Sequence, residues 1–196
     1  MDKILVTGGV GYLGQWVVKE LEKHYNVVVA DLNLPNYETS PNTVYKKVDL
    51  KNSLGLDVLL DNIDAVVHLA AIPRPVGYKP EDVFETNMVT TFNIVEASIR
   101  ANVKKIIFSS SGSSLGFAYS FTEMIPDYMP IDEEHPLRPQ DSYGLSKAFG
   151  EDILKAATIR SGISTIALRP TTVIVPADYE ERVPQMLSTK QETKNR

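Results

Sequence analysis

Short runs of hydrophobic residues alternate along the chain with longer stretches in which hydrophobic positions recur at helical spacing. The short runs are rich in valine and isoleucine and nearly continuous, which is typical of strands buried on both faces of a sheet. They predict strands at 3–7, 26–30, 44–48, 64–69, 104–109 and 163–168. The longer stretches predict helices at about 12–24, 53–61, 80–101 and 142–161. Such alternation predicts an α/β fold, a doubly wound parallel (Rossmann) sheet with helices on both faces.

Three loop-like stretches, 35–41, 72–78 and 112–141, each follow a predicted strand. In an open parallel sheet ligands bind beyond the carboxyl ends of the strands, so these loops are expected at the binding edge. We expect residues 1–187 to form one nucleotide-binding domain. Residues 188–196 form a polar tail that we expect to be frayed.

Composition and charge exclude several classes of function. The chain has 196 residues, enough for one domain with a substantial core, and a formal charge of −5 without a basic block, which disfavours nucleic-acid binding. It has no cysteine, and its three histidines lie far apart, so no metal site is expected. No hydrophobic run approaches the length of a membrane span, and the chain starts directly with a predicted strand. These features predict a cytoplasmic protein that does not associate with membranes.

The most informative segment follows the first predicted strand, where glycines recur at positions 8, 11 and 14. A strand that turns sharply into a helix needs residues without a Cβ that tolerate positive φ. The N-terminus of that helix then presents N–H groups and a positive dipole end, which suit a pyrophosphate. A tight turn without a ligand is the alternative interpretation of the glycines alone.

Asp31 makes a dinucleotide the better interpretation. It ends the second predicted strand, about 20 residues beyond the glycines, where the adenosine ribose of a bound dinucleotide lies. A carboxylate accepts hydrogen bonds from the ribose hydroxyls and repels a 2′-phosphate. Neither lysine nor arginine occurs between Asp31 and Lys46, so we expect NAD to be preferred over NADP.

Tyr143 and Lys147 are four residues apart at the start of a predicted helix, so their side chains share one face. They follow the longest loop and a strand that ends in Ser109, Ser110 and Ser111. A lysine ammonium one turn away, together with a positive nicotinamide ring, is expected to lower the pKa of the tyrosine from its usual value near 10. The tyrosinate can then take a hydroxyl proton while a hydride leaves carbon, and a serine beside it can hold the same oxygen. An exposed pair at an ordinary helix start is the alternative.

Taken together, these motifs resemble the extended short-chain dehydrogenase/reductase family, in its NAD-dependent sugar epimerase/dehydratase group. The matches span nearly the whole chain in the family's order: Thr7-Gly8-Gly9-x-Gly11-x-x-Gly14, Asp31, Val48-Asp49-Leu50, His68-Leu69-Ala70-Ala71, Asn87, Phe108-Ser109-Ser110-Ser111, Tyr143-x-x-x-Lys147 and Leu168-Arg169-Pro170.

The resemblance implies a role for each matching residue. For the cofactor it implies a pyrophosphate turn at Gly8, Gly11 and Gly14, with the N–H groups of Tyr12 and Leu13 on the phosphates. It places Asp31 on the adenosine ribose, and Asp49 and Leu50 beside the adenine. The path to the nicotinamide ribose is lined by Leu69, Ala70 and Ala71. For catalysis it implies Ser111, Tyr143 as the base, and Lys147 as its partner, which also holds the nicotinamide ribose. Asn87 is implied to be structural or to support Lys147. Arg169 is implied to brace loops near the site, with a substrate contact as the alternative.

The chain departs from the family pattern at two places. Leu115-Gly116 stands where the family shows Tyr-Gly, and Gly112-Ser113 stands where dehydratases carry an Asp-Glu pair. Dehydration is therefore disfavoured, and epimerisation or alcohol oxidation of a sugar or nucleotide-sugar is expected. The loop with Arg74 and the serines after Ser111, such as Ser113, also resemble uronate dehydrogenases, which oxidise a sugar acid at C1. The guanidinium of Arg74 would be a natural partner for the carboxylate of such an acid. A solvated Arg74 is the alternative.

Family members continue past the strand that ends near Arg169, whereas this chain stops about 25 residues later. We therefore expect most of the substrate-binding half to be absent and apolar surface on the last strand to be uncovered. An NAD-binding module without turnover is the rival function. In this family the two long helices, here 80–101 and 142–161, pair across a dimer, so the resemblance also implies a homodimer.

Overall fold

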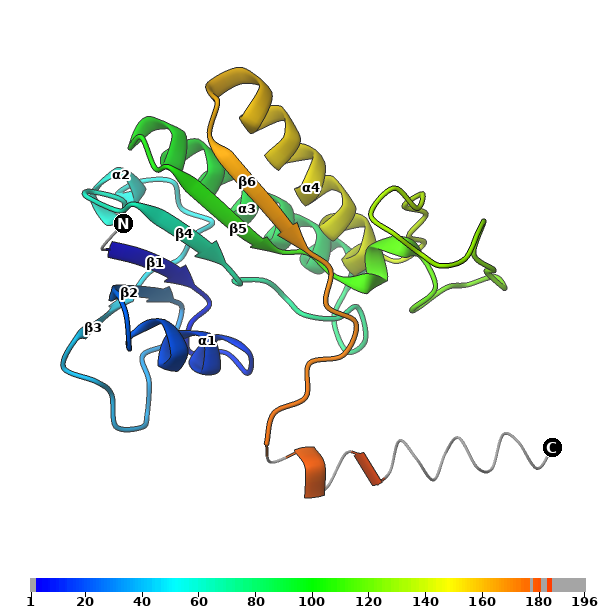
Figure 1. Ribbon diagram of the computed structural model, residues 1–196, viewed down its shortest axis with the longest axis horizontal. Helices are drawn as coiled ribbons and strands as arrows, with labels where there is room; N and C mark the ends of the chain where they lie inside the picture. The colour runs from blue at the N-terminus through cyan, green and yellow to red at the C-terminus, as the bar shows by residue number, and fades with distance from the viewer. Residues whose placement is uncertain (1–2, 177, 181–182, 185–196) are drawn as a thin grey trace.

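The protein is built on one six-stranded sheet in which every strand is parallel to its neighbours (Figure 1). The structure is a computed structural model that describes residues 3–176, 178–180 and 183–184. The strand order is β3-β2-β1-β4-β5-β6. The strands are β1 (Lys3–Thr7), β2 (Asn26–Asp31), β3 (Thr43–Lys47), β4 (Ala65–His68), β5 (Lys105–Ser109) and β6 (Ser164–Leu168). The predicted doubly wound sheet is confirmed, and each predicted strand matches an observed one within a residue or two.

Helices connect the strands as predicted, with two differences at their ends. They are α1 (Gly14–Leu21), α2 (Leu56–Leu59), α3 (Pro80–Arg100), the short 3-10 helix η1 (Gly112–Leu115) and α4 (Ser142–Ser161). Helix α1 begins two residues later than predicted, because the residues before Gly14 form the turn after β1. Helix α2 is a single turn that begins three residues later than predicted, since Gly55 immediately before it adopts a left-handed conformation with φ +84°.

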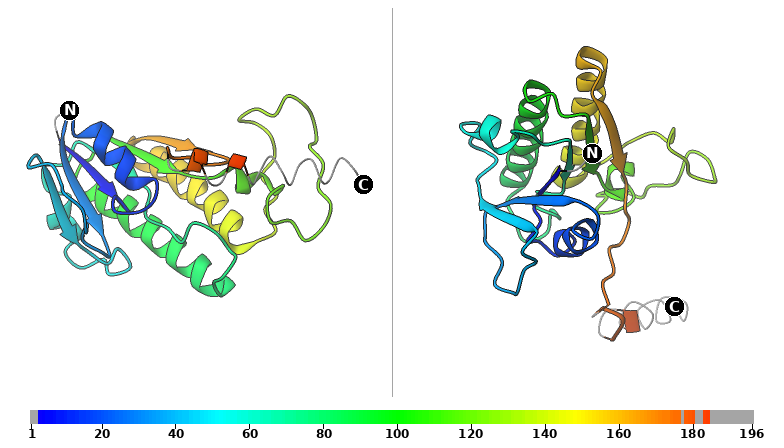
Figure 2. Two further views of the ribbon diagram at one scale, coloured as in Figure 1. Left: turned by 90° about the horizontal axis from the view of Figure 1, so that it is seen from below. Right: turned by 60° about the vertical axis from the view of Figure 1, so that its left-hand side comes forward.

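The helices cover the two faces of the sheet unequally (Figure 2). Helices α2, α3 and α4 pack on one face over the larger core, which includes Leu5, Ile106 and Phe108. Helix α1 packs on the other face through Val18. The outermost strand β6 is largely exposed, with Leu168 54% accessible. The expected uncovered apolar surface is therefore present on this strand.

This arrangement brings the carboxyl ends of the strands, and the three predicted loops, to one edge of the sheet. Within the described ranges, no helix has both the length and the hydropathy needed to cross a membrane. The predicted polar tail, residues 188–196, and the end of the predicted domain at 187 lie outside the described residues.

Candidate active site

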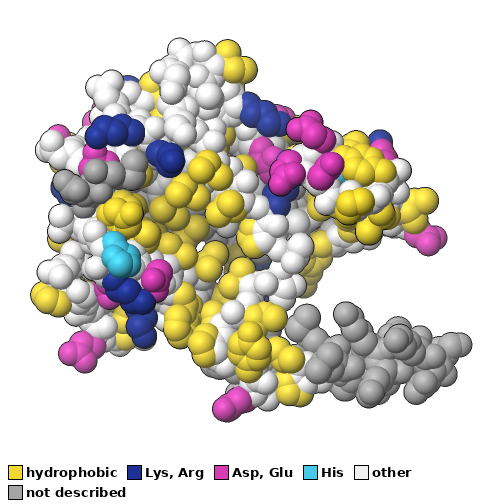
Figure 3. All heavy atoms as spheres, in the orientation of Figure 1, with side chains coloured by type: hydrophobic (Ala, Val, Ile, Leu, Met, Phe, Trp, Pro, Cys, Tyr) yellow, Lys and Arg dark blue, Asp and Glu magenta, His cyan; other side chains and the backbone are white. Residues whose placement is uncertain are grey.

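A large cavity of about 1250 Å³ opens at the carboxyl edge of the sheet. Its walls come from the segments after all six strands and from α3 and the start of α4. Hydrophobic side chains gather around a hollow in the middle of this face (Figure 3). Ligand pockets in proteins have volumes of roughly 300–1,000 Å³. The cavity therefore has room for a dinucleotide together with a second molecule.

The glycine-rich turn forms one end of the cavity. Gly8 has φ +71°, and a Cβ there would lie 2.7 Å from the backbone nitrogen of Ala70. A Cβ on Gly14 would collide with the carbonyl oxygen of Gly8. The turn therefore packs backbone against backbone, and only glycine fits at these two positions. The turn and Gly14, the first residue of α1, line the cavity, and the N-terminus of a helix is the end at which anions bind.

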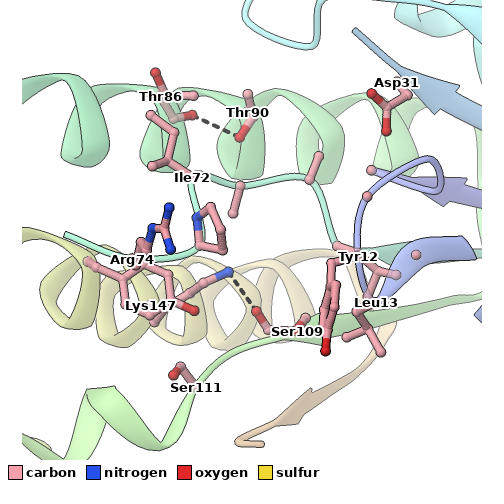
Figure 4. Close-up of a pocket in the computed structure, with 18 of the residues that line it drawn as sticks. Tyr12, Leu13, Asp31, Ile72, Arg74, Thr86, Thr90, Ser109, Ser111 and Lys147 are labelled. Carbon is pink, nitrogen blue, oxygen red and sulfur yellow. Dashed lines mark hydrogen bonds between the residues drawn. The ribbon is translucent and has the colours of Figure 1, made fainter. Parts of the chain in front are cut away.

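Asp31 stands beside this turn at the end of β2 (Figure 4). One carboxylate oxygen accepts a hydrogen bond from the N–H of Val10 at 3.0 Å, and the other accepts from the N–H of Asn33 at 3.0 Å. The carboxylate is thus held between the glycine turn and the loop after β2, and it lines the cavity. This position agrees with the predicted contact to an adenosine ribose, which stays a prediction.

The other predicted cofactor residues line the same cavity: Tyr12, Leu13, Asp49, Leu50, Leu69, Ala70 and Ala71. The carbonyl oxygen of Leu50 accepts a hydrogen bond from the Asn93 amide of α3 at 2.9 Å. The amide of Asn87 accepts from the N–H of Ile72 at 2.7 Å and donates to its carbonyl oxygen at 3.1 Å. The same Asn87 amide donates to the Ser146 hydroxyl at 3.0 Å. Asn87 therefore ties the loop after β4 to α4, which favours the structural interpretation of this residue.

Helix α4 presents Tyr143 and Lys147 to the opposite end of the cavity. Its N-cap, Asp141, accepts hydrogen bonds from the N–H groups of Tyr143 and Gly144, each at 2.9 Å, which fixes the first turn. The Lys147 ammonium donates to the carbonyl oxygen of Ser109 at 2.7 Å (Figure 4) and lies 5.7 Å from the centroid of the Tyr143 ring. Ser111 lines the same wall, and its hydroxyl oxygen accepts from the N–H of Ser113 at 3.1 Å. The structure thus brings the predicted serine, tyrosine and lysine together.

Burial shifts the pKa values of both Lys147 and Tyr143. Burial lowers the pKa of Lys147 to about 7. Burial also raises the pKa of Tyr143, and a hydrogen bond with Ser111 only partly opposes this. Desolvation is the largest influence on the Tyr143 pKa in the protein without cofactor, and interactions with Tyr119 and Asp141 raise it further. The expected lowering of the tyrosine pKa includes the charge of a bound nicotinamide ring, and it stays a prediction for the protein with cofactor.

His68 is buried beneath the cavity and connects three elements. Its ring nitrogens pair with the Thr7 hydroxyl of β1 at 2.7 Å and with the Thr91 hydroxyl of α3 at 3.1 Å. Burial lowers the pKa of His68 to about 3, so the ring is neutral at physiological pH. The residue is a hydrogen-bonded structural histidine that supports the glycine turn from below.

Three further predicted residues lie in different settings. Arg74 and Ser113 line the cavity, with Arg74 exposed at its mouth (Figure 4). Arg169 is not part of the cavity wall formed by the described residues. Its guanidinium instead makes two hydrogen bonds to the Glu151 carboxylate, at 2.9 and 2.7 Å, and one to the carbonyl oxygen of Glu133 at 3.2 Å. The geometry favours the bracing role of Arg169 over the substrate contact.

Sequence reasoning missed two groups of residues. Glu151 is buried on α4, where it also accepts a hydrogen bond from the Ser110 hydroxyl at 2.6 Å and so links the serine run to Arg169. The cavity wall also includes Tyr119 of the long loop and the segment 170–173 after β6. A glutamate in a helix gives no sequence signal of burial. The spacing of Tyr143, Lys147 and Glu151 at four-residue intervals was the available hint.

Comparisons with known proteins place the chain in a family. The model of the NAD dependent epimerase/dehydratase family matches residues 4–193, and the chain belongs to this family. The predicted resemblance is confirmed, and NAD is the cofactor of the family. Gly8 and Gly14, where a side chain would fill the turn, together with the volume of the cavity, fit a dinucleotide.

Two curated relatives illustrate the functions within this family. The chain is 34% identical over 175 residues to the UDP-glucose 4-epimerase of Lactobacillus helveticus, covering 85% of this chain and 50% of that protein. It is 31% identical over 170 residues to the uronate dehydrogenase of Pseudomonas putida, covering 86% of this chain and 60% of that protein. The chain therefore spans about half the length of the curated relatives it matches.

A solved structure shows the same fold with its cofactor. The UDP-glucose 4-epimerase of Thermus thermophilus, in complex with NAD, superimposes with a TM-score of 0.73 at 28% identity. The match covers 85% of this chain and 54% of that chain.

Proposed function

We propose that this chain carries the NAD site and the catalytic residues of an oxidoreductase or epimerase that acts on a hydroxyl group of a sugar or nucleotide-sugar. The observation that carries the proposal is the cavity, which has the glycine turn and Asp31 at one end and Ser111, Tyr143 and Lys147 at the other. Membership of the family and similarity to sugar epimerases and a uronate dehydrogenase support it.

The residues of this chain suggest how the reaction proceeds. Bound NAD would supply the acceptor for the hydride that leaves the carbon of the substrate alcohol. The phenol oxygen of Tyr143, as phenolate, takes the hydroxyl proton, and the Ser111 hydroxyl donates a hydrogen bond to the same substrate oxygen. Lys147 is anchored on the Ser109 carbonyl at 2.7 Å, one helical turn from Tyr143, and its protonated form favours the phenolate. In the reverse direction Tyr143 returns the proton to the ketone.

The proposal also assigns the remaining predicted contacts. Gly8, Gly11, Gly14 and the N–H groups of Tyr12 and Leu13 hold the pyrophosphate, and Asp31 holds the adenosine ribose. Asp49 and Leu50 flank the adenine, while Leu69, Ala70 and Ala71 line the path to the nicotinamide. Each of these residues lies on the cavity wall.

A uronate-type sugar dehydrogenase is the second candidate, and Arg74 favours it. Its side chain is exposed and lines the same cavity as Lys147 (Figure 4), where the guanidinium can pair with the carboxylate of a sugar acid. Replacing Arg74 with methionine then weakens turnover of uronic acids more than that of neutral sugars. Equal losses for both substrate classes would contradict this candidate.

The test of the proposed function uses two readouts on one panel of uronic acids, hexoses and UDP-sugars. NADH absorbance detects net oxidation, and NMR of the sugar detects epimerisation, which gives no net NADH. With a protein that also contains the substrate-binding half, we expect one of the two signals for wild type and its loss with Tyr143→Phe, at unchanged NAD affinity. Retention of activity by Tyr143→Phe within about tenfold, equivalent to about 1.4 kcal/mol, would contradict the assignment of the base.

A further inference from the structure

The chain after β6 returns to the glycine turn, at the far end of the cavity from the catalytic residues. Its first residues are held near the serine run, because the N–H of Gly112 donates to the carbonyl oxygen of Pro170 at 2.9 Å. Residues 170–173 then line the cavity. Beyond them the segment runs to the side of the sheet on which α1 lies (Figure 1, and right view of Figure 2).

This segment is joined to the glycine turn by a side-chain hydrogen bond. The hydroxyl of Tyr12, between Gly11 and Gly14, donates to a carboxylate oxygen of Asp178. Figure 4 shows the Tyr12 ring pointing away from Asp31, so the side chain leaves the ribose end of the turn clear.

Asp178 is held in place by hydrogen bonds within its own segment. Its side chain is buried, with the residue only 6% accessible. The carboxylate oxygen that accepts from Tyr12 also accepts from the N–H of Val175 at 2.8 Å, and the N–H of Asp178 donates to the carbonyl oxygen of Val175 at 2.9 Å. These reciprocal bonds close a tight turn around the carboxylate, and the turn presents a fixed acceptor to the tyrosine.

We propose that Asp178 is a positioning residue for the cofactor, which acts through Tyr12 to fix the glycine turn and to join it to the segment after β6. The inference rests on the proposed placement of the pyrophosphate at the N–H groups of Tyr12 and Leu13. A turn that is held before binding loses less conformational freedom on binding, and this increases affinity. The bond also connects two walls of the cavity, so NAD leaves faster when the bond is absent.

The expected effect is a faster dissociation of the cofactor. Hydrogen bonds to charged groups are among the stronger ones in proteins, but the Tyr12 residue is 46% accessible, which reduces the effect. We expect Tyr12→Phe and Asp178→Ala each to raise the NADH dissociation rate by about three- to tenfold. Because related binding sites differ mainly in dissociation rate, the association rate should change less.

The experiment follows NADH fluorescence by stopped flow with the 196-residue protein, and it is independent of turnover. The matched control is Tyr128→Phe, since the Tyr128 hydroxyl also donates to an aspartate, Asp132, at 2.6 Å, but in the long loop outside the cavity lining. This control should leave the dissociation rate unchanged. Thermal unfolding of each variant measures any general loss of stability.

A double-mutant cycle separates the proposed bond from independent effects. If the two residues act through one bond, Tyr12→Phe combined with Asp178→Ala releases NADH no faster than the more affected single variant. Multiplication of the two single effects, or dissociation rates equal to wild type despite a lowered melting temperature, would overturn the proposal. Absence of NADH binding by the wild-type protein would instead overturn the proposed cofactor site itself.

Discussion

Replacing Lys147 with methionine should make the protein more stable near neutral pH, although the lysine lies in the proposed active site. The residue is 4% accessible, and burial lowers its pKa from 10.5 to about 7. A charged ammonium in this position is therefore less stable than in water. Methionine has a similar length and no charge, so it removes this cost while filling most of the same space.

The magnitude follows from linkage between protonation and folding. A depression of the pKa from 10.5 to about 7 corresponds to roughly 5 kcal/mol at most, at about 1.4 kcal/mol per pKa unit. The full cost applies below about pH 7, where Lys147 is charged in both the folded and unfolded states. It falls as the pH rises toward 10.5, because there the unfolded state binds the proton and the folded state does not. Loss of the hydrogen bond to the Ser109 carbonyl offsets about 0.5–1.5 kcal/mol.

The assay is urea unfolding of wild type and Lys147→Met at two pH values. We expect the variant to gain about 2–4 kcal/mol near pH 6, and this gain to shrink by about 2–3 kcal/mol near pH 9. Lys155→Met on the same helix is the control, since that side chain is 65% exposed and its substitution should be nearly neutral at both pH values. A gain that does not depend on pH, or a loss of stability at both values, would refute the account of a desolvated lysine.

Three other predictions address the cofactor, the base and the assembly. Asp31→Ala combined with Leu32→Arg should shift the preference from NAD toward NADP in calorimetry with both cofactors, because the carboxylate that repels a 2′-phosphate is removed. Tighter binding of NADP by the unmodified protein would contradict the role of Asp31. Tyr143→Phe should leave the NAD dissociation constant within about twofold while turnover falls by orders of magnitude, because only the titrating hydroxyl is removed; a large loss of affinity would point to a cofactor role for that hydroxyl instead. If α3 and α4 pair across a homodimer, Phe149→Glu should favour the monomer in sedimentation experiments. The reason is that Phe149 is 45% exposed on α4 and contacts Phe84 of α3. An unchanged sedimentation profile would exclude this face as the interface.

The fold was predictable because the inner strands of its parallel sheet are largely buried. Runs such as Val27–Ala30 are continuously hydrophobic, and that pattern identifies both the strand and its burial on two faces. The late start of α2 was harder to predict, since it depends on the left-handed conformation of Gly55, and glycine also occurs within helices.

The site was predictable only where its chemistry requires particular residues at a fixed spacing. The glycine turn, Asp31 and the pair of Tyr143 and Lys147 are of this kind, and the structure places them around one cavity. The hydrogen bonds of Glu151 and the bond between Tyr12 and Asp178 were not predictable, because they join residues that come together only in the folded chain. The direction of the Tyr143 pKa also depends on burial, which the spacing of two residues does not reveal.

The most direct test of the central claim is a rapid-mixing measurement of NADH formation when protein with bound NAD meets a sugar or nucleotide-sugar substrate. Both an epimerase and a dehydrogenase form NADH in the first step, so this signal is independent of the overall reaction. With the substrate-binding half present in both proteins, the account predicts NADH formation by the wild type and its loss with Tyr143→Phe, although both proteins bind NAD equally well. Equal NADH formation by the two proteins would contradict the claim that Tyr143 is the base in this cavity.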